Sequence, residues 1–312
     1  MEQALNMKNK AKKVVDLSHI AWELGFPFNN CGNFSMIPMP NGFWFAYMRI
    51  FAYWIDEHGR YLTNKKLLLQ NPANHQFCVL DKDFNFVRKI PNVVSEYWEH
   101  PVFSSETPYM EDGRLVVWNG KVYLSTTVCY QKDGQWNAAG LEIQRLDFQQ
   151  DAVRATHFWN TIERGVAGIQ KNWLPVPDKP FHYIVGTSRS GAQHIDISTG
   201  EVFDVGTVDK KVLYRGNTPL VEVDGGYAAI THVVDMDAPV KTYVNHVVKY
   251  DKNLCPISIS KPFKLTEKPI EFVTDLKVIG NEVLIGVTEN DDTPFIMAFD
   301  RDEILGEKLF EV

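Results

Sequence analysis

The sequence predicts an all-β protein, a single five-bladed β-propeller of four-stranded antiparallel blades that spans residues 1–312. Two observations support this prediction: a hairpin pattern occurs five times, and a strand-turn-strand pattern follows each hairpin. Residues 1–28 are expected to form a lead-in segment before the first blade. The alternatives are an open β-sandwich or two smaller β-domains.

The five hairpins are indicated by turn residues that separate stretches of alternating apolar and polar residues. Asn-Gly, Asp-Gly and Gly-Asn tolerate the positive φ that a two-residue hairpin turn requires. The predicted hairpins are Ile37–Ile50, Leu115–Val128, Leu174–Thr187, Leu220–Val233 and Leu276–Glu289. Their turns lie at Asn41, Asn119, Asp178, Asp224 and Gly280. The spacing of these turns runs from 46 residues (178 to 224) to 78 residues (41 to 119), which suits one blade each.

The third and fourth strands of each blade are expected after its hairpin. Each segment is an apolar strand that ends near an acidic residue and a polar turn. The segments are Gln76–Val87, Leu141–Val153, Ala192–Val202, His246–Ile257 and Pro294–Leu305. Short helical segments are expected only at Val14–Leu24 and Trp159–Gly168. The long first interval predicts that Tyr53–Asn74 and Pro91–Tyr109 are insertions on one face.

Composition excludes several classes of protein. The chain has 19 Phe, 12 Tyr and 8 Trp, is 45% hydrophobic and carries a net charge of -7. Such a chain folds around a core and has no general affinity for nucleic acid. The sequence shows neither a membrane span nor a secretory signal, so we expect a cytoplasmic protein without membrane contact. Its four cysteines, Cys31, Cys78, Cys129 and Cys255, are expected to be reduced thiols.

Polar residues recur where the predicted hairpins begin or end. Ligands of propellers bind at the mouth of the central channel, so these residues are the candidate site. The segment Glu111-Asp112-Gly113-Arg114 has two carboxylates beside an arginine. One carboxylate could have a raised pKa and the other a lowered pKa, as acid chemistry at a glycosidic oxygen requires. Lys171, Asn172 and Trp173 form a candidate sugar platform. The alternative for Glu111–Arg114 is a solvated turn. The alternative for the second motif is that Trp173 packs between blades.

The other candidates come from the remaining hairpins. Arg215, His232, Tyr243 and His246 could converge on an anion, although a lone histidine is more often structural. Glu271 lies inside an apolar stretch, which indicates a paired or functional carboxylate. The full set is Asp112, Glu111 and Glu271 for catalysis, and Asn30, Arg49, Arg114, Lys171, Asn172, Trp173, Arg215, His232, Tyr243 and His246 for binding a sugar or phosphate.

Three of these motifs resemble glycoside hydrolase family 130, the five-bladed-propeller mannoside phosphorylases and mannosidases, and their related mannosyltransferases. The motifs are Glu111–Gly120, Lys171–Pro175, and Arg215–Pro219 followed by a hairpin that ends in His232. The resemblance implies that Asp112 delivers the proton and that Arg114 is the motif arginine. It also implies that Arg49, Lys171, Arg215, His232 and Tyr243 are the candidates for binding phosphate.

One departure from the family pattern concerns the residue after Asp112. Gly113 stands where the family has proline, which predicts a looser loop around Asp112.

The leading functional prediction is an inverting phosphorylase or hydrolase of a mannoside-like sugar. Glu111 or Glu271 would counter the oxocarbenium charge. Inorganic phosphate is a candidate co-substrate; no other cofactor and no metal site are predicted. The ligand is expected to be a carbohydrate or sugar phosphate, and the oligomeric state is left open. The alternatives are a glycosyltransferase that uses a sugar nucleotide or sugar phosphate, and a non-catalytic propeller that binds a glycan or a protein.

Overall fold

The computed structural model of the protein describes ten stretches of the chain. They are residues 4–26, 30–51, 53–56, 61–63, 74–93, 109–132, 135–160, 172–209, 214–235 and 242–310. The chain divides into two compact units. Unit 1 comprises Met1–Leu17, Ile55–Arg60 and Asn172–Val312, and unit 2 comprises Ser18–Trp54 and Tyr61–Lys171. The prediction of a single domain stays a prediction.

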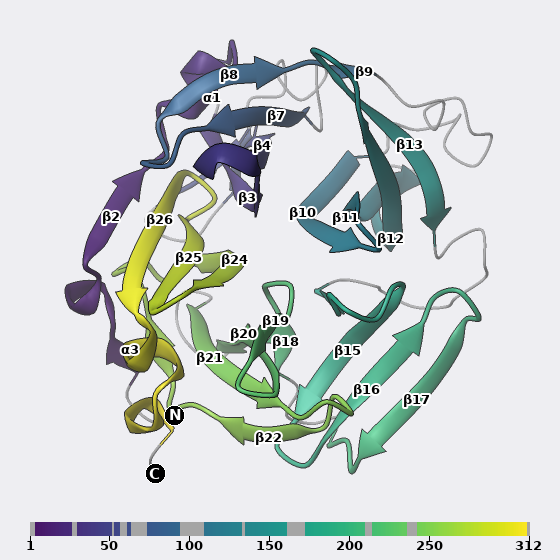
Figure 1. Ribbon diagram of the computed structural model, residues 1–312, viewed down its shortest axis with the longest axis vertical. Coiled ribbons are helices and arrows are strands. Elements are labelled where there is room, and N and C mark those ends of the chain that lie inside the picture. Colours follow the sequence, from purple (N-terminus) through teal and green to yellow (C-terminus); the bar gives the residue numbers. More distant parts are fainter. Residues whose placement is uncertain are drawn as a thin grey trace. The chain divides into compact units, whose positions relative to one another are not determined.

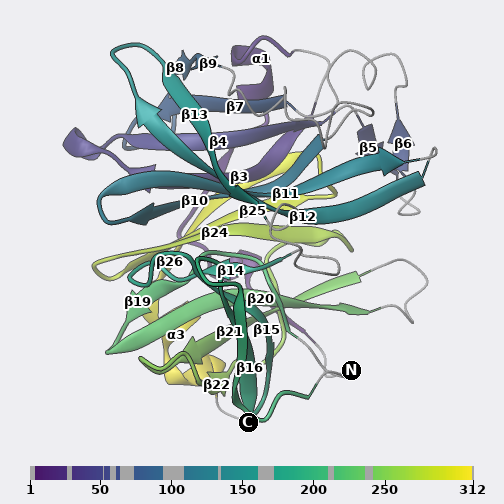
Figure 2. The ribbon, with the colours of Figure 1, turned by 90° about the vertical axis from the view of Figure 1, so that its right-hand side faces the viewer.

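Unit 2 contains two large antiparallel sheets. The first has the order β3 (Asn30–Pro38), β4 (Trp44–Phe51), β7 (Asn74–Leu80) and β8 (Phe86–Ile90). The second has the order β10 (Tyr109–Trp118), β11 (Lys121–Lys132), β12 (Gln135–Phe148) and β13 (Val153–Asn160), and β9 (Asn92–Val93) joins β13 in parallel. Figure 2 shows the long strands β11 and β12 side by side.

The remaining elements around this unit are short. They are α1 (Ile20–Glu23), η2 (Pro40–Gly42), β5 (Tyr53–Ile55) and β6 (Tyr61–Thr63). The core of unit 2 is made by apolar side chains of both sheets, including Phe45, Phe77, Leu115 and Leu124. Apolar alternation along the strands therefore gives each sheet the buried face that the sequence predicts.

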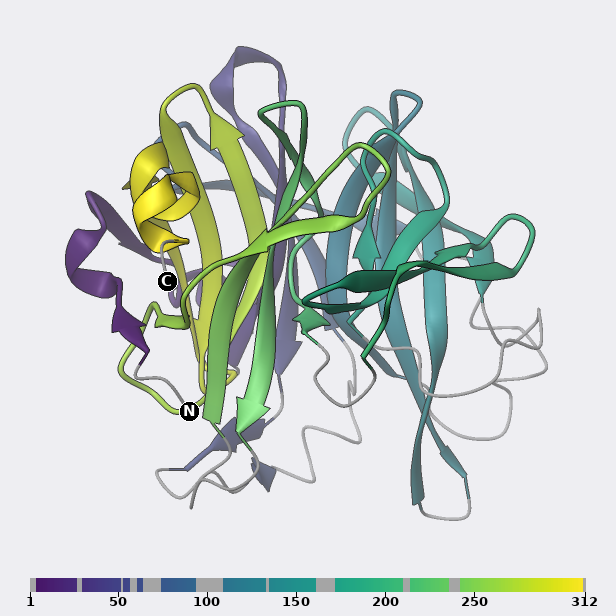
Figure 3. The same ribbon diagram turned by 90° about the horizontal axis from the view of Figure 1, so that it is seen from below.

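Unit 1 contains three large sheets. One has the order β14 (Leu174–Pro175), β15 (His182–Ser188), β16 (Gly191–Asp196) and β17 (Glu201–Gly206), and Figure 1 shows its last three strands side by side. Another is formed by β24 (Glu271–Ile279), β25 (Glu282–Glu289), β26 (Thr293–Asp300) and β2 (Lys13–Asp16). Helix α3 (Arg301–Leu305), visible in yellow in Figure 3, and η5 (Glu307–Leu309) follow β26.

The third sheet of unit 1 has seven strands. They are β18 (Arg215–Gly216), β19 (Val221–Val223), β20 (Gly226–Asp235), β21 (Thr242–Tyr250), β22 (Pro256–Ile259), β23 (Phe263–Lys264) and β1 (Leu5–Asn6). Strand β1 pairs with β23 in parallel, and η1 (Lys8–Lys10) leads from β1 toward β2. The main core of unit 1 consists of buried apolar residues, among them Ala228, Val247, Phe263, Val273 and Ile285.

The predicted fold class is confirmed: the protein is all-β, with four-stranded antiparallel blades of the propeller type. All five predicted hairpins form antiparallel strand pairs. Four of the five predicted turn residues have positive φ, namely Asn41 (69°), Asn119 (50°), Asp224 (43°) and Gly280 (59°). The turn dipeptides therefore mark the hairpins for the reason expected.

The predicted count of five four-stranded blades is wrong for the described strands. Three sheets have four strands, whereas the sheet of β10–β13 gains β9 and the sheet of β20 and β21 takes in further short strands. These additions use strands of two or three residues that carry no alternation pattern long enough to read from sequence.

The predicted strand-turn-strand at Pro294–Leu305 is also wrong in its second half. Residues after β26 form α3 instead, and β2 from the N-terminal segment pairs with β26, with Lys13 opposite Ala298 and Asp16 opposite Phe295. Figure 1 shows β2, in purple, beside β26, in yellow. Residues 13–16 are thus part of a sheet and not a lead-in, because an open edge of β26 would leave ladder groups unpaired.

The first of the two helical predictions is confirmed in part, whereas the second is not confirmed by the described residues. Of Val14–Leu24, only Ile20–Glu23 is helical. Of Trp159–Gly168, Trp159 and Asn160 belong to β13, and the rest lies outside the described residues, as do most of the two predicted insertions.

Candidate functional site

The first polar cluster lies in unit 2, at two β-bulges. Strand β10 slips in its pairing with β11 between Glu111 and Arg114, and Asp112 inside this bulge has a φ of 52°. Strand β3 slips in the same way between Gly32 and Ser35, and Asn33 there has a φ of 43°. A left-handed conformation is uncommon for residues other than glycine, and bulges of this kind re-aim side chains near functional sites.

The side chains of these two bulges meet. Nδ2 of Asn33 donates a hydrogen bond to Oδ1 of Asp112 at 2.8 Å. Nη1 of Arg49 lies 3.6 Å from the same Asp112 oxygen, and Nη2 of Arg49 lies 3.5 Å from Oε1 of Glu111. Only 5% of Asp112 and 4% of Arg49 is exposed. Because a buried charge must be paired, the Arg49 guanidinium is balanced by this pair of carboxyl groups.

The backbone of the bulge is secured from two sides. Nη1 of the buried Arg114 donates to the carbonyl oxygen of Asp112 at 2.7 Å. A Cβ added at Gly113 would lie 2.3 Å from Cε1 and Cζ of Tyr47, so no side chain fits there. Burial raises the pKa of the Tyr47 hydroxyl, against the opposing effect of Arg49. The glycine therefore makes room for a packed tyrosine ring, and the predicted looser loop is not what this packing shows.

The second polar cluster lies in unit 1, around His232. In the strand register, His232 of β20 is opposite Arg215 of β18 and Asn245 of β21. The His232 ring stacks on Tyr243, with ring centroids 4.9 Å apart and an interplanar angle of 18°. It meets Phe272 edge to face at 5.8 Å. Arg215 is exposed, whereas only 1% of His232 is exposed. The structure thus brings the predicted residues Arg215, His232 and Tyr243 together.

Glu271 belongs to this second cluster. Its Oε1 accepts hydrogen bonds from the Leu265 amide at 3.0 Å and from Nδ2 of Asn245. Its Oε2 accepts from the amide and the hydroxyl of Thr266, both at 2.8 Å. The carboxylate is fully buried, and this burial raises its pKa to about 7 although the Leu265 amide opposes the shift. Both oxygens are therefore occupied by groups of the protein.

Asn172 and Trp173 lie next to the Arg215 strand. The carbonyl oxygen of Asn172 would lie 2.5 Å from a Cβ built at Gly216, so the two backbones touch. Trp173 is 4% exposed, and its ring centroid is 6.0 Å from that of Tyr183. This burial fits the alternative of a packed tryptophan better than an open sugar platform. Lys171 lies outside the described residues.

Two other predicted residues point elsewhere. Nδ1 of His246 lies 2.9 Å from the Ser260 carbonyl oxygen, and its ring meets Tyr214 edge to face at 5.0 Å. Successive residues of a strand alternate between faces, so His246 is on the face opposite Asn245. Nδ2 of Asn30 donates to the carbonyl oxygen of Tyr53 at 3.2 Å.

Sequence reasoning missed four buried residues: Asn33, Tyr47, Asn217 and Asn245. Asn217 and Asn245 stand within the quoted motifs Arg215–Pro219 and Tyr243–His246. Both are completely buried, and a buried amide must find hydrogen-bond partners. For Asn245, an asparagine in the middle of the apolar strand Thr242–Tyr250 is the signal that could have identified it.

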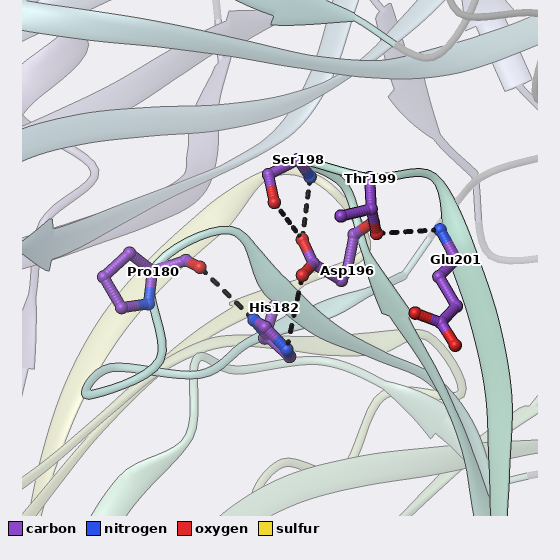
Figure 4. A network of polar contacts seen from close by, with 6 residues as sticks. All are labelled: Pro180, His182, Asp196, Ser198, Thr199 and Glu201. Atoms are coloured by element: carbon purple, nitrogen blue, oxygen red, sulfur yellow. Dashed lines mark hydrogen bonds and ion pairs between the residues drawn. The ribbon is translucent and has the colours of Figure 1, made fainter.

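A separate polar network closes the turn between β16 and β17 (Figure 4). Oδ1 of Asp196 accepts from the amide and hydroxyl of Ser198 at 2.8 and 2.6 Å, and Nε2 of His182 lies 3.8 Å from Oδ2. Burial would raise the pKa of Asp196, but these hydrogen bonds and His182 lower it. The network stabilises a surface turn.

Other observations bear on metals, thiols and membranes. Within the described stretches, no group of three or more His, Cys, Asp or Glu residues is placed to hold a metal ion. Cys31, Cys78 and Cys255 are free thiols, and burial raises the pKa of Cys78 to about 12. The side chain of Cys129 lies outside the description. No helix of the described chain is long and apolar enough to cross a membrane.

The comparisons with known proteins rest on structure. No protein-family model matches the sequence, and a search of curated proteins finds no match. The structure resembles β-1,2-mannobiose phosphorylase from Listeria innocua, with a TM-score of 0.55 and 12% identity over 95% of this chain and 99% of that one. It also resembles MPT-1, a GDP-Man-dependent mannosyltransferase from Leishmania mexicana, with a TM-score of 0.52 and 11% identity over 93% and 89% of the two chains.

A third similar structure comes from work on glycoside hydrolase family 130. That work describes the family of mannoside phosphorylases as containing glycoside hydrolases that target β-1,2-mannosidic linkages in Candida mannan. The TM-score is 0.58 and the identity 10%, over 87% of this chain and 84% of that one. The protein therefore shares its fold with the mannoside phosphorylases, glycoside hydrolases and mannosyltransferases to which its motifs are similar.

Proposed function

We propose that the protein is a carbohydrate-active enzyme that cleaves a mannoside-like sugar, with Asp112 as the proton donor. One observation supports this most strongly: Asp112 is buried in a left-handed bulge and oriented by Asn33 and Arg49. Rare backbone conformations that the surrounding structure holds in place cluster at active sites. The structural likeness to mannoside phosphorylases supports the choice of sugar.

The proposed reaction is inverting phosphorolysis. A phosphate oxygen bonds to the anomeric carbon from one face while the bond from this carbon to the glycosidic oxygen breaks, and Asp112 gives its proton to that leaving oxygen. Arg49 supplies positive charge beside Asp112. Glu111, paired with Arg49, is the nearby carboxylate that would counter the oxocarbenium charge. No cofactor other than inorganic phosphate is required.

The test is an assay with β-1,2-mannobiose in the presence and absence of inorganic phosphate. We expect mannose and α-mannose 1-phosphate to form only with phosphate, and Asp112→Asn to lower the rate at least a hundredfold. Asp224→Asn is the matched control, because Asp224 also has positive φ but lies in an exposed hairpin turn. Full activity of Asp112→Asn would overturn the assignment of Asp112. Phosphate-independent release of mannose would indicate hydrolysis.

A mannosyltransferase is the second candidate, favoured by the likeness to the GDP-Man-dependent enzyme. It predicts transfer of mannose from GDP-mannose to a mannoside acceptor without added phosphate. Transfer in this assay, with no phosphorolysis of mannobiose, would replace the first proposal by the second.

A further inference from the structure

One buried histidine of unit 1 takes no part in the proposed reaction. His194 of β16 is 1% exposed, and in the strand register it lies opposite Ile184 of β15 and Phe203 of β17. Its ring stacks on that of Phe203, with centroids 5.3 Å apart and an interplanar angle of 12°. Neither ring nitrogen makes a hydrogen bond of normal geometry to the described residues. A buried polar group without such a bond is rare and calls for an explanation.

The His194 ring lies where a turn of the sheet of β20 and β21 packs against β16. This turn, residues 251–255, joins β21 to β22, and the backbone of Leu254 is close enough to the ring to favour its protonated form. The Leu254 side chain is buried in one apolar cluster with Ala192 of β16. Nζ of Lys179, in the turn before β15, donates to the Lys252 carbonyl oxygen at 3.0 Å. Apolar packing and one lysine thus attach residues 251–255 to the sheet of β14–β17.

The buried ring is neutral at neutral pH. Burial is the main reason that the pKa of His194 falls from 6.5 to about 4, and Lys179 and His182 lower it further. The Leu254 backbone and Asp204 of β17 oppose this shift. A proton on the ring would therefore be shielded from solvent and would face the Lys179 ammonium, although the Asp204 carboxylate favours it.

The other charged groups on the packed segments have partners of their own. Nε2 of His182 lies 3.8 Å from Oδ2 of Asp196, whose other oxygen accepts hydrogen bonds from Ser198 (Figure 4). Glu201 is exposed at the start of β17. The remaining groups are Asp178, which accepts from the Tyr227 hydroxyl at 2.6 Å, Asp251, which accepts from the Cys255 amide at 2.8 Å, and Lys252, which lies 3.8 Å from Glu222.

We propose that His194 is an acid-sensitive latch, which holds residues 251–255 against the sheet of β14–β17 while its ring is neutral and releases them when the ring is protonated. The neutral ring packs against Phe203 and the Leu254 backbone, whereas a protonated ring gains hydration only by leaving this position. Its charge also repels the Lys179 ammonium, which forms the second attachment of the same turn. Protonation thus weakens both attachments. The latch goes beyond the proposed reaction and needs neither sugar nor phosphate.

The pH range of the release follows from the two states of the ring. In the open turn the exposed ring has its ordinary pKa of 6.5, so the open state binds the proton at pH values where the closed state does not. The closed turn keeps its full stability above pH 6.5 and loses it as pH falls toward 4. The equilibrium should shift toward the open turn by about twentyfold between pH 7 and pH 5.

A second turn of the same geometry provides an internal control. Residues 81–85 join β7 to β8, and in both turns the amide of the first residue, an aspartate, donates to the carbonyl oxygen of the fifth at 2.9 Å. The fourth residue has a positive φ in both, 66° at Leu254 and 70° at Phe84. In both turns Oδ1 of the aspartate accepts from the amide of the fifth residue. The Phe84 ring, however, packs against Trp44, which does not titrate.

Hydrogen exchange measures the opening of each turn as the protection factor of its amides at each pH. The Leu254 amide donates to the Asp251 carbonyl oxygen, and the Phe84 amide to that of Asp81, both at 3.0 Å. We expect the protection of the Leu254 amide to fall about twentyfold from pH 7 to pH 5, and that of the Phe84 amide to stay constant.

Two variants test the origin of this fall. His194→Phe keeps an aromatic ring beside Phe203 but cannot be protonated, so the Leu254 amide should stay protected at pH 5. His182→Gln is the matched control, because it removes a partly exposed histidine of the same sheet and should leave most of the fall in place.

Equal changes of protection at Leu254 and Phe84 in the wild-type protein would overturn the proposal. So would an acid-induced loss of Leu254 protection that persists in His194→Phe. If this variant does not fold, NMR titration of the wild-type protein decides, with the His194 ring assigned through its contact with Phe203. The latch requires a neutral ring at pH 5, and titration near pH 6.5 in the folded protein would refute it. None of these measurements involves catalysis, so a failure of the latch is distinct from a failure of the proposed function.

Discussion

Asn33 and Asp112, 79 positions apart in sequence, are each held in a left-handed conformation at a bulge and joined by a 2.8 Å hydrogen bond. Neither bulge would orient the carboxylate alone, because Asp112 needs a donor and Asn33 provides one from a neighbouring strand of the same unit.

Replacing Asn33 by alanine should destabilise the protein by about 2–3 kcal/mol. The change removes a hydrogen bond to a buried carboxyl oxygen, and it puts alanine, whose side chain cannot form a local hydrogen bond, at a position with positive φ. Urea unfolding followed by circular dichroism measures the loss. Asn41→Ala is the matched control, since Asn41 has a φ of 69° but is exposed. Equal losses for the two variants would show that the bond to Asp112 contributes nothing.

Gly113→Ala should be more destabilising than a glycine replacement in an open turn. The new methyl group would overlap the buried Tyr47 ring, at a cost of about 1–3 kcal/mol for overpacking. Gly120→Ala meets no atom within 4 Å but has a φ of 71°, so it reports backbone strain alone. The double variant Gly113→Ala/Tyr47→Leu should lose less than the sum of the two single variants. Strict additivity in unfolding experiments would contradict the contact.

Glu271 should make stability depend on pH. Its pKa is raised by burial to about 7 in the folded protein, from 4.5 for an exposed glutamate. Between these values the folded state binds the proton and the unfolded state does not, so stability falls as pH rises from about 4.5 to 7. The size is on the order of 3 kcal/mol.

The measurement compares the unfolding free energies of the wild-type protein and Glu271→Gln between pH 4.5 and 8. As pH rises, the unfolding free energy of the wild-type protein should fall relative to that of Glu271→Gln. Glu267→Gln, on the same segment but exposed, should give a difference that stays flat. A flat difference for Glu271→Gln as well would refute the prediction.

Leu17→Ala should destabilise unit 1 far more than a change on the preceding strand β2. Leu17 is completely buried, and its amide donates to the Pro294 carbonyl oxygen at 2.9 Å. Truncating a buried leucine costs about 2–5 kcal/mol, whereas Val14→Ala, at a side chain 44% exposed, should cost under about 1 kcal/mol. Differential scanning calorimetry distinguishes these outcomes, and similar melting temperatures would argue against a structural role for the N-terminal segment.

Much of the fold could be predicted because hairpin turns are encoded locally. Asn119-Gly120 and Asp224-Gly225 supply the positive φ that their turns use. The pairing of β2 with β26 could not be predicted, since residues 13–16 have no local feature that specifies a partner near residue 296. The two short strands β1 and β9, which pair in parallel with β23 and β13, could not be predicted either, because they also lack a local feature that specifies a partner.

The candidate site shows a similar division. Ionisable residues such as Asp112, Arg49 and His232 stood out because a β-rich core excludes such groups unless they are paired. Their hydrogen-bond partners Asn33 and Asn217 were not selected as site residues, because both look like ordinary turn residues in sequence. A bulge that turns Asp112 toward Asn33 depends on pairing with other strands, which no single stretch of sequence specifies.

The sheet that contains β2 has a consequence for the order of folding. Lys13–Asp16 must wait for Thr293–Asp300, which a ribosome produces some 280 residues later, before their ladder can close. Contacts of such sequence separation form slowly, because a large loop of chain has to be closed first. We therefore expect this sheet to be completed in the last kinetic step, after release of the C-terminal strands from the ribosome, with the edge of β26 exposed to aggregation until then.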